Sequence, residues 1–332
     1  MTAPLAVRSI ADFRPERVVK VPDLPELAEL DGPERQACLD LGIERVHADP
    51  DQDAVDLAAG AGRKVLAETG AAPGALLVIG SRASGRLMSS EATRLQELLG
   101  LTDALTFSVG GLGCVSITPA LLTARGLLAA DPGLGEVLVV HGSKPPTPRR
   151  YRHPVTVSGD GGQAVLLART GPVRVLDIAQ ATNGAYWDLF TVDFRDVPTA
   201  DWRERCADPR RYSFTLAMEG RTRLRELYRE LLDRNGMTAA DVTCHLSQNL
   251  SAGAFRFTEE ALGIRLADAC AGNLAANGHL GPNDVLLNLS SAIAGGELPP
   301  GSRAVVFNAS PVAAWSLLLV EHGGGEAETH YL

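Results

Sequence analysis

The first half of the chain alternates between helical and extended apolar patterns. Apolar residues recur at helical spacing over 52–69, and an unbroken apolar run over 75–79 follows and ends at Gly80. The alternation continues with helices predicted at 89–99 and 115–130, and with buried strands predicted at 104–109, 136–141 and 163–168. Strands this apolar, when they alternate with helices, are typical of a parallel or mixed sheet covered on both faces.

The second half repeats this order of elements. The pattern predicts helices at 214–235, 249–262 and 283–295, and strands at 242–246, 264–267, 304–307 and 313–320. The recurrence indicates duplication of one α/β unit, with an N-terminal half at 1–170 and a C-terminal half at 171–332. Ligand sites are then expected where loops of the two halves meet beyond the strand ends.

One stretch of the second half has no regular period. Residues 183–211 are rich in Asp, Arg and Trp, and they include Trp187, Phe190 and Trp202. Because large aromatic side chains are costly to expose to water, we interpret this segment as a cap over a binding cleft. An ordinary surface loop explains the same composition equally well.

The composition excludes several classes of protein. The 332 residues are 45% hydrophobic and 21% charged, as in soluble globular proteins, and the formal charge of −9 argues against a nucleic-acid-binding surface. The most apolar run, 313–320, is far shorter than the roughly 20 residues that cross a bilayer, and the charged first twenty residues do not resemble a signal peptide. We therefore expect a cytoplasmic protein that binds neither nucleic acid nor membrane.

The five cysteines lack the spacing of a metal site, so we expect no bound metal and a reducing compartment. Cys114 stands between a Gly-rich turn, 110–113, and the predicted helix at 115–130. At a helix N-terminus, free N–H groups and the helix dipole favour thiolate over thiol. Cys114 is therefore the candidate nucleophile for acyl groups, and a buried structural cysteine is the alternative.

Two histidines lie in corresponding turns of the second half. His245 lies near the end of the predicted strand 242–246, and His279 lies in a glycine-flanked turn before the helix 283–295. Each alone would be more simply a structural or surface residue, but with Cys114 they suit nucleophilic catalysis with an imidazole base. The Gly-rich turn also begins like a dinucleotide-binding fingerprint, but Ser116 occupies its third glycine position, which argues against that function.

Short motifs extend these candidates over nearly the whole chain. They are residues 41–45, 107–120, 137–141, 159–165, 218–221, 245–249 and 296–301, followed by Trp315. In order and spacing they resemble the thiolase-fold condensing enzymes, and among these the β-ketoacyl-acyl-carrier-protein synthase III group. The resemblance implies a duplicated five-layered αβαβα fold, a homodimer, and a cysteine that takes an acyl group from a thioester.

Residue by residue, the resemblance makes Cys114 the nucleophile and His245 the histidine of a His-Gln-Ala-Asn motif. The match is imperfect, because Gln248 falls on the asparagine position and Asn249 comes one residue late. His279 falls where the group has an asparagine, and an imidazole can donate the same single hydrogen bond.

Three asparagines are further candidates. If the register slips, Asn273 or Asn277 takes the third catalytic position. Together with Asn249, they are also candidates for contact with the substrate or its carrier.

The turn before the last strand departs from the group's pattern. In the group this turn gives a backbone N–H to the oxyanion hole, but here it contains Pro311, which has no N–H. Losing such a donor costs about 2.7–4 kcal/mol in comparable sites. Ser310 or Val312 is the candidate replacement.

The residues that hold coenzyme A in the group are also missing, and Gln36 and Asp40 stand near their positions. This favours a phosphopantetheine thioester on an acyl carrier protein as the donor, with coenzyme A as the alternative, and we expect no tightly bound cofactor. Arg256 and the basic cluster 149–152 are candidates for meeting an acidic carrier, and a solvated surface is the alternative.

These expectations combine into one functional prediction. We expect an acyltransferase of ketosynthase III type, which passes an acyl group from Cys114 to a small-molecule acceptor in fatty-acid-like or polyketide-type metabolism. Either carbon–carbon condensation or transfer to an oxygen or nitrogen nucleophile fits the residues. The alternative is a catalytically impaired relative that only binds carrier proteins.

Overall fold

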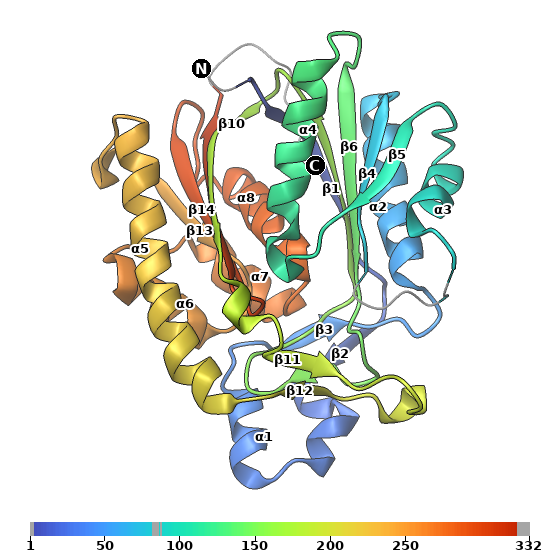
Figure 1. The fold of residues 1–332 in the computed structure, drawn as a ribbon, viewed down its shortest axis with the longest axis vertical. Helices are drawn as coiled ribbons and strands as arrows, with labels where there is room; N and C mark the ends of the chain where they lie inside the picture. The colour runs from blue at the N-terminus through green and yellow to red at the C-terminus, as the bar shows by residue number, and fades with distance from the viewer. Residues whose placement is uncertain (1–2, 82–85, 87, 324–332) are drawn as a thin grey trace.

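A computed structural model of the chain describes residues 3–81, 86 and 88–323, and its centre is a nine-stranded sheet (Figure 1). In sheet order the strands are β13 (Cys244–Ser247), β14 (Arg303–Ser310), β15 (Ala314–His322), β10 (Val173–Thr182), β1 (Ala6–Phe13), β9 (Gly161–Ala168), β6 (Glu136–Ser143), β4 (Ala75–Ile79) and β5 (Leu105–Val109). Parallel pairs join β4 to β5 and β6, and β13 to β14, while the other pairs are antiparallel. The sheet is therefore mixed, as predicted.

Smaller elements complete the fold. The helices are α1 (Gly32–Leu39), α2 (Ala54–Thr69), α3 (Glu91–Leu98), α4 (Ile117–Ala130), α5 (Ala217–Arg234), α6 (Ala252–Leu262), α7 (Asp268–Asn277) and α8 (Asp284–Ala294). Three strand pairs lie outside the main sheet: β2 (Val18–Lys20) with β3 (Arg45–His47), β7 (Tyr151–Arg152) with β8 (Thr156–Val157), and β11 (Phe190–Val192) with β12 (Glu204–Cys206).

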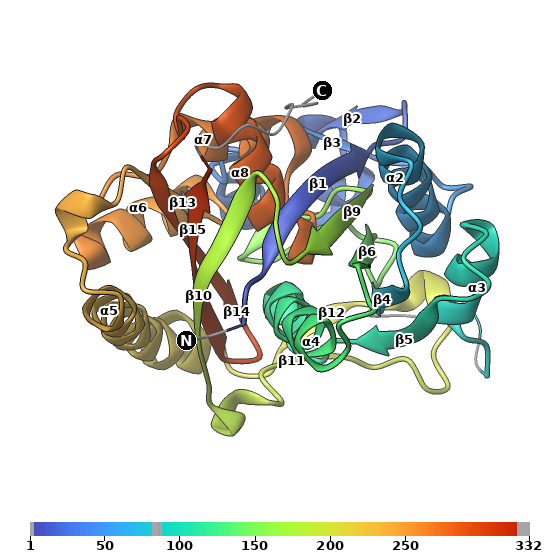
Figure 2. The same cartoon turned by 90° about the horizontal axis from the view of Figure 1, so that it is seen from above.

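The sheet has two parts, one from β13 to β10 and the other from β1 to β5 in sheet order. Together with the long helices, these two parts form five layers (Figure 2). On one outer face, α2 packs on β1, β6 and β9, and α3 packs on β4 and β5. On the other, α5 packs on β10 and β15 and against α6. Between the two parts of the sheet, α4 packs on β4 and β6, and α8 packs on β13 and β14. This arrangement confirms the predicted thiolase-like αβαβα fold.

The strands divide along the chain near the predicted boundary at residue 170. β1, β4, β5, β6 and β9 come before it, β10 and β13 to β15 come after it, and β1 joins the two groups by pairing with both β9 and β10. The assignment of 1–170 and 171–332 as separate domains stays a prediction.

The prediction of a strand at 264–267 is wrong. This segment is extended, but it forms no strand ladder, and Ala267 N–H donates a single backbone hydrogen bond to the His245 carbonyl. The sequence pattern also misses β1 and β10, in which polar residues interrupt the apolar ones, and α7, whose small residues form no clear apolar stripe.

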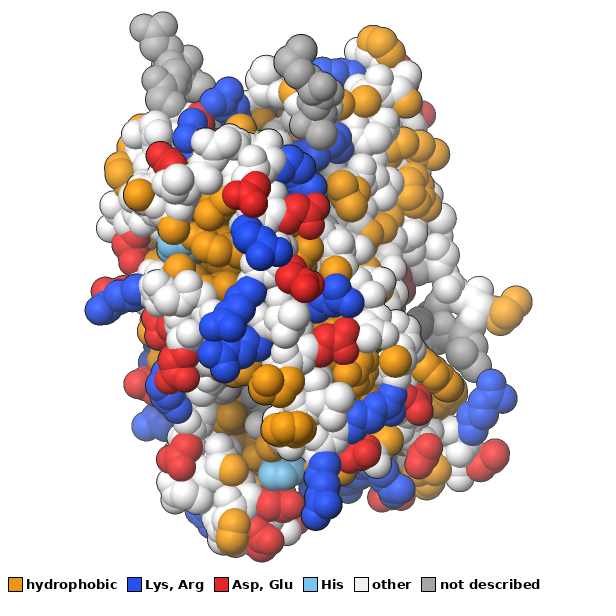
Figure 3. All heavy atoms as spheres, turned by 60° about the vertical axis from the view of Figure 1, so that its left-hand side comes forward, with side chains coloured by type: hydrophobic (Ala, Val, Ile, Leu, Met, Phe, Trp, Pro, Cys, Tyr) orange, Lys and Arg blue, Asp and Glu red, His pale blue; other side chains and the backbone are white. Residues whose placement is uncertain are grey.

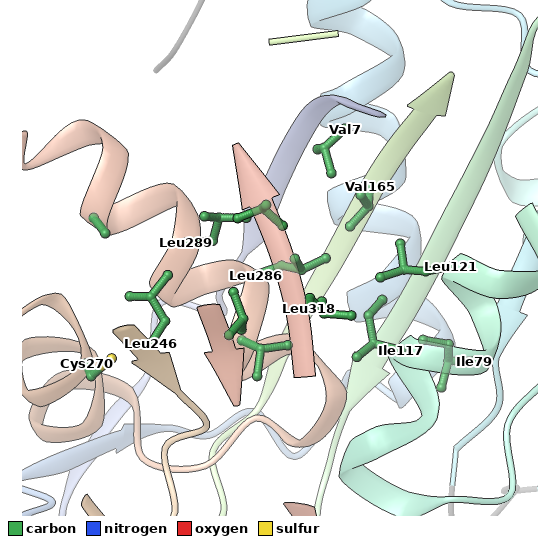
Figure 4. Packing of buried hydrophobic residues seen from close by; sticks show 14 of the residues in the cluster. Val7, Ile79, Ile117, Leu121, Val165, Leu246, Cys270, Leu286, Leu289 and Leu318 are labelled. Carbon is green, nitrogen blue, oxygen red and sulfur yellow. The ribbon is translucent and has the colours of Figure 1, made fainter. Parts of the chain in front are cut away.

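The middle layer contains the largest hydrophobic core. Side chains of α4, α8 and β15 meet there, and Ile117, Leu121, Leu286 and Leu318 are each at most 2% exposed (Figure 4). The segment Gly113–Ala130 is long and apolar enough to cross a membrane by length and composition, but more than half of it is buried inside the protein. Its place in the middle layer accounts for its apolar composition.

The irregular segment 183–211 contains β11 and β12 and lies near α1 in Figure 1. Phe190 and Trp202 are partly buried, and the Arg152 guanidinium lies 4.6 Å from the centre of the Phe190 ring. Trp187, however, is 77% exposed. The aromatic side chains are thus not uniformly buried, and the role of the segment as a cap stays a prediction.

Candidate active site

Cys114 lies in a single turn of 3-10 helix, Gly113–Ser116, that leads directly into α4. The chain reaches it through Gly110, Gly111 and Gly113, which all have positive φ, a conformation that glycine adopts with little strain. The cysteine is fully buried, and Asn308 Nδ2 in β14 donates a 2.9 Å hydrogen bond to its carbonyl. The thiol is thus fixed at the entry to a helix, as predicted.

One of the two predicted histidines lies beside this thiol. His279 Nε2 is 3.1 Å from Cys114 Sγ, and His279 Nδ1 is 2.6 Å from Oδ2 of Asp284, the first residue of α8. Asp284 also accepts the backbone N–H of Leu280 at 2.7 Å and that of Asn249 at 2.9 Å. The residues Cys114, His279 and Asp284 are each at most 5% exposed. They form a Cys-His-Asp triad in which a buried carboxylate orients the imidazole.

The backbone of the His279 turn is held on both sides. Its N–H donates to the Val157 carbonyl at 2.9 Å, and its carbonyl accepts Gly159 N–H at 3.0 Å. Gly278 has a φ of 63°, and a Cβ atom there would lie 2.6 Å from the Val157 carbonyl oxygen. A larger residue therefore does not fit, and this glycine fixes the direction of the imidazole.

The neighbours of His279 in the triad change the pKa of its imidazole. Burial alone lowers the pKa of His279, but Cys114 and Asp284 together outweigh it and raise this pKa to about 10. The arrangement therefore favours an imidazolium, the neighbour that a nucleophilic thiolate requires. By contrast, burial raises the pKa of each of the thiols of Cys38, Cys244 and Cys270 to about 12, so these cysteines stay protonated at neutral pH.

His245, the other predicted histidine, points to the opposite face of the sheet. Its Nε2 is 2.8 Å from the Tyr228 hydroxyl of α5, and its ring stacks on Phe307 with 6.1 Å between centroids. Its neighbours Cys244 and Leu246 face the middle-layer core, and side chains alternate between faces along a strand. The structure therefore does not bring His245 to the thiol, and burial lowers its pKa to about 4.

The predicted asparagines lie behind the triad rather than at the thiol. Asn249 holds Asp284 through its backbone N–H, and its side chain accepts a 2.7 Å hydrogen bond from Asn288 Nδ2. Asn273 Nδ2 donates to Asn288 Oδ1 at 2.9 Å, and Asn277 Nδ2 donates to the Asn273 carbonyl at 3.1 Å. Asn249 therefore supports Asp284, whereas the bonds of Asn277 join it to α7 and to Arg14 Nε at 2.6 Å. The contacts of these asparagines with a substrate or carrier stay predictions.

The turn expected to supply an oxyanion donor connects β14 to β15. Ser310 ends β14, and its Oγ lies 3.5 Å from Val312 N–H across Pro311. Ala313 has a φ of 52°, which is unusual for a residue with a Cβ atom. The choice of Ser310 or Val312 as the donor stays a prediction.

The basic cluster at 149–152 is engaged inside the chain. Its arginines form the ion pairs Arg149–Glu29, Arg150–Asp160 and Arg152–Glu204. Arg256 is exposed on α6, next to Phe257, which is 37% exposed. Arg256 is therefore the more accessible of the arginines predicted to meet a carrier, and that contact stays a prediction.

The sequence reasoning did not identify Asp284, although a signal was present. Asp284 follows His279 by five residues at the start of a predicted helix, where a carboxylate is favoured by the helix dipole. The complete triad matches the arrangement of a nucleophile, a general base and an orienting carboxylate. Within the described ranges, no group of three or more His, Cys, Asp or Glu side chains is arranged to hold a metal ion.

Comparison with known proteins finds similar sequences and similar folds. No protein-family model matches the chain. The chain is 24% identical over 284 residues to β-ketoacyl-[acyl-carrier-protein] synthase III of Pectobacterium atrosepticum, a match that covers 83% of this chain and 87% of the relative.

Solved structures show the same fold over almost the full length. ChlB3, described as an acyltransferase, has a TM-score of 0.81 at 23% identity and covers 96% of this chain and 98% of its own. The synthase III of Pseudomonas aeruginosa PAO1 has a TM-score of 0.78 at 20% identity with the same coverage. AbyA1, a tetronic acid condensing enzyme, has a TM-score of 0.75 at 23% identity and covers 96% of this chain and 99% of its own. The chain therefore has the fold of these condensing enzymes, as its motifs predict, and its sequence is similar to that of a β-ketoacyl-acyl-carrier-protein synthase III.

Proposed function

We propose that this protein is an acyltransferase that takes an acyl group from a thioester onto Cys114 and passes it to a hydroxyl or amine. The observation that carries this proposal is the contact of His279 Nε2 with Cys114 Sγ at 3.1 Å, with Asp284 behind the imidazole. The likeness to synthase III and to ChlB3 supports acyl transfer in fatty-acid-like or polyketide-type metabolism.

In the first half-reaction, the Cys114 thiolate attacks the thioester carbonyl and forms a tetrahedral intermediate. When this collapses, the carbon–sulfur bond to the donor breaks, and the His279 imidazolium gives its proton to the departing thiolate. The products are the donor thiol and an acyl-Cys114 enzyme with a neutral imidazole.

In the second half-reaction, neutral His279 takes the proton of an acceptor hydroxyl or amine as that group attacks the acyl carbonyl. The bond to Cys114 then breaks, and the thiolate and imidazolium are restored. Asp284 stabilises the imidazolium in both steps and keeps Nε2 directed at the thiol.

One of the two predicted histidines lies at the thiol, and this favours transfer of the acyl group to oxygen or nitrogen over carbon–carbon condensation. The structure brings His279 to the thiol, while His245 lies on the opposite face of the sheet with Tyr228. A single general base is sufficient to deprotonate a hydroxyl or amine. Condensation is the second candidate, because the synthase III relative and AbyA1 carry condensing-enzyme names.

The acyl donor we propose is a phosphopantetheine thioester on an acyl carrier protein. Cys114 is fully buried, which suits an acyl group presented on a long flexible arm. Gln36 and Asp40, near the positions of the missing coenzyme A residues, hydrogen-bond to each other at the C-terminal end of α1. No tightly bound cofactor is required by this chemistry.

The face formed by α5 and α6 is the proposed contact for the carrier. Apolar, basic and acidic side chains are interspersed on this side of the molecule (Figure 3). Phe214 and Met218, one helical turn apart before and within α5, are 70% and 51% exposed, and Arg256 is exposed on α6. An arginine and exposed apolar groups on two helices that pack together suit an acidic protein partner.

Two further parts of the proposal concern assembly and location. The strand β5 is an edge of the nine-stranded sheet, with Leu105 55% exposed, and an open edge of this kind supports pairing with a second copy in a homodimer. The five cysteines are free thiols, which supports a reducing, cytoplasmic setting.

Intact-mass measurement tests the function. The protein is incubated with the same acyl group on a carrier protein and on coenzyme A, and then with malonyl carrier, an alcohol or an amine. We expect acylation to be faster from the carrier, and discharge by the alcohol or amine. Discharge by malonyl carrier alone supports condensation, and failure to acylate with any donor supports a carrier-binding relative without catalysis.

A further inference from the structure

A chain of buried amides extends from Asp284 away from the thiol. Asn249, Asp284 and Asn288 are each 0% exposed. Asn288 lies four residues after Asp284 on α8, so both side chains project from one face of the helix. The loop that follows β13 passes across this face and contacts both residues.

Asn288 holds that loop at two points. Its Nδ2 donates to the Ser247 carbonyl at 2.6 Å and to Asn249 Oδ1 at 2.7 Å. Its Oδ1 accepts Asn273 Nδ2 at 2.9 Å. Both amide hydrogens and the amide oxygen are therefore used, as expected for a polar side chain with no access to water.

The loop needs such an anchor because regular structure does not fix it. Asn249 comes two residues after the end of β13 and three residues before α6 begins. Its backbone N–H nevertheless donates to Oδ2 of Asp284, the same oxygen that contacts His279 Nδ1. A displacement of Asn249 would thus alter the carboxylate oxygen that orients the imidazole.

We propose that Asn288 is a positioning residue for acyl transfer, which keeps Asn249 N–H on Asp284 and so keeps His279 directed at Cys114. This inference rests on the proposed function, because it assigns Asn288 to the support of that triad. Small misplacements of catalytic groups cost up to about 10²-fold in rate, which sets the scale of the effect.

The test forms acetyl-Cys114 with acetyl-N-acetylcysteamine and then follows its loss to an added amine or alcohol by intact mass, over a range of pH, in Asn288→Leu and Asn249→Ala. The second variant keeps the backbone N–H but removes the acceptor for Asn288. We expect deacylation to be slower by about tenfold in each, with the double variant no slower than Asn288→Leu alone.

The pH profile separates positioning from a merely structural role. In the acyl-enzyme, neutral His279 is the base, and Asp284 raises its pKa. Weakening their contact therefore moves the acid limb of the deacylation profile to lower pH, and a loss of stability alone does not move it. Asn235→Leu is the control for lost stability, because it removes a 2.7 Å hydrogen bond to Asp177 Oδ2 at the end of α5 and leaves the clamp on the loop, and its profile should match wild type.

The Asp284→Asn variant separates a failure of the proposed function from a failure of the inference about Asn288. If Asp284→Asn leaves deacylation unchanged, the triad and the proposed function fail. If it slows deacylation while folded Asn249→Ala and Asn288→Leu keep the wild-type rate and profile, the inference about Asn288 alone is overturned. Should Asn288→Leu fail to fold, Asn249→Ala by itself decides between these outcomes.

Discussion

Two parts of the molecule combine a cysteine with a histidine, and their environments give them opposite properties. At the junction of the two halves, Cys114 and His279 come from distant parts of the chain, and Asp284 stands behind the imidazole. On β13, Cys244 and His245 are adjacent in sequence, but their side chains point to opposite faces of the sheet. Proximity in sequence therefore does not produce a reactive pair, whereas convergence of two turns does.

The difference also appears in the electrostatics. Charged neighbours raise the pKa of His279 to about 10, whereas burial without such neighbours lowers that of His245 to about 4. Desolvation acts on both rings, so the partners decide the outcome. His279 is arranged to carry a proton, and His245 is a neutral ring that fills space beside Tyr228 and Phe307.

The largest expected effect is on the nucleophile. Cys114→Ala should abolish the acyl-enzyme, because the other thiols remain protonated and buried or lack an orienting triad. Cys244→Ala, the matched change in the second pair, should keep full acylation. Peptide mapping after incubation with an acyl thioester checks both, and an acyl group found on Cys244 would reverse the comparison.

The next largest effect is the difference in activity between variants of the two histidines. His279→Ala is expected to lower acyl transfer by about 10²–10⁴-fold, the usual contribution of a general base. His245→Gln, which keeps an acceptor for Tyr228, should stay within about threefold of wild type, since it is remote from the thiol. Steady-state rates with a carrier-bound donor compare them, and similar losses in both variants would contradict our assignment.

Thiol reactivity sharpens the contrast without a substrate. Iodoacetamide should alkylate Cys114 faster than Cys244 at neutral pH, because only the former has an imidazolium in contact to favour its thiolate. His279→Ala should slow alkylation of Cys114 by about 10–100-fold and leave Cys244 unaffected. Mass-resolved alkylation rates provide the measurement, and an unchanged rate for Cys114 would show that the helix N-terminus alone generates the thiolate.

The smallest effect concerns stability and pH. The pKa of His245 is about 4 when folded and near 6.5 when unfolded, so the unfolded state binds more protons between these values. The wild type should therefore lose stability as the pH falls from about 6.5 to 4, and His245→Gln should lose about 1–2 kcal/mol less over that range. Urea denaturation at both ends of the range checks this, and parallel curves would refute it.

The sequence patterns anticipate the parts of the site that depend on local chemistry. A glycine turn before an apolar helix indicates Cys114, and a glycine-flanked turn indicates His279, because special backbone conformations require particular residues. The alternation of apolar strands and helices likewise predicts the layered α/β fold, since each strand must be covered on both faces.

Which side chains meet was decided only by the tertiary structure. His245 satisfies a motif in sequence, but a shift of one position along β13 places a side chain on the opposite face. Asp284 carries no motif and becomes part of the triad because α8 begins at the His279 turn, which packs against the helix of Cys114. Local sequence determines the conformation of each turn, but the packing of the two halves against each other determines which turns converge, because those contacts join residues more than 160 positions apart.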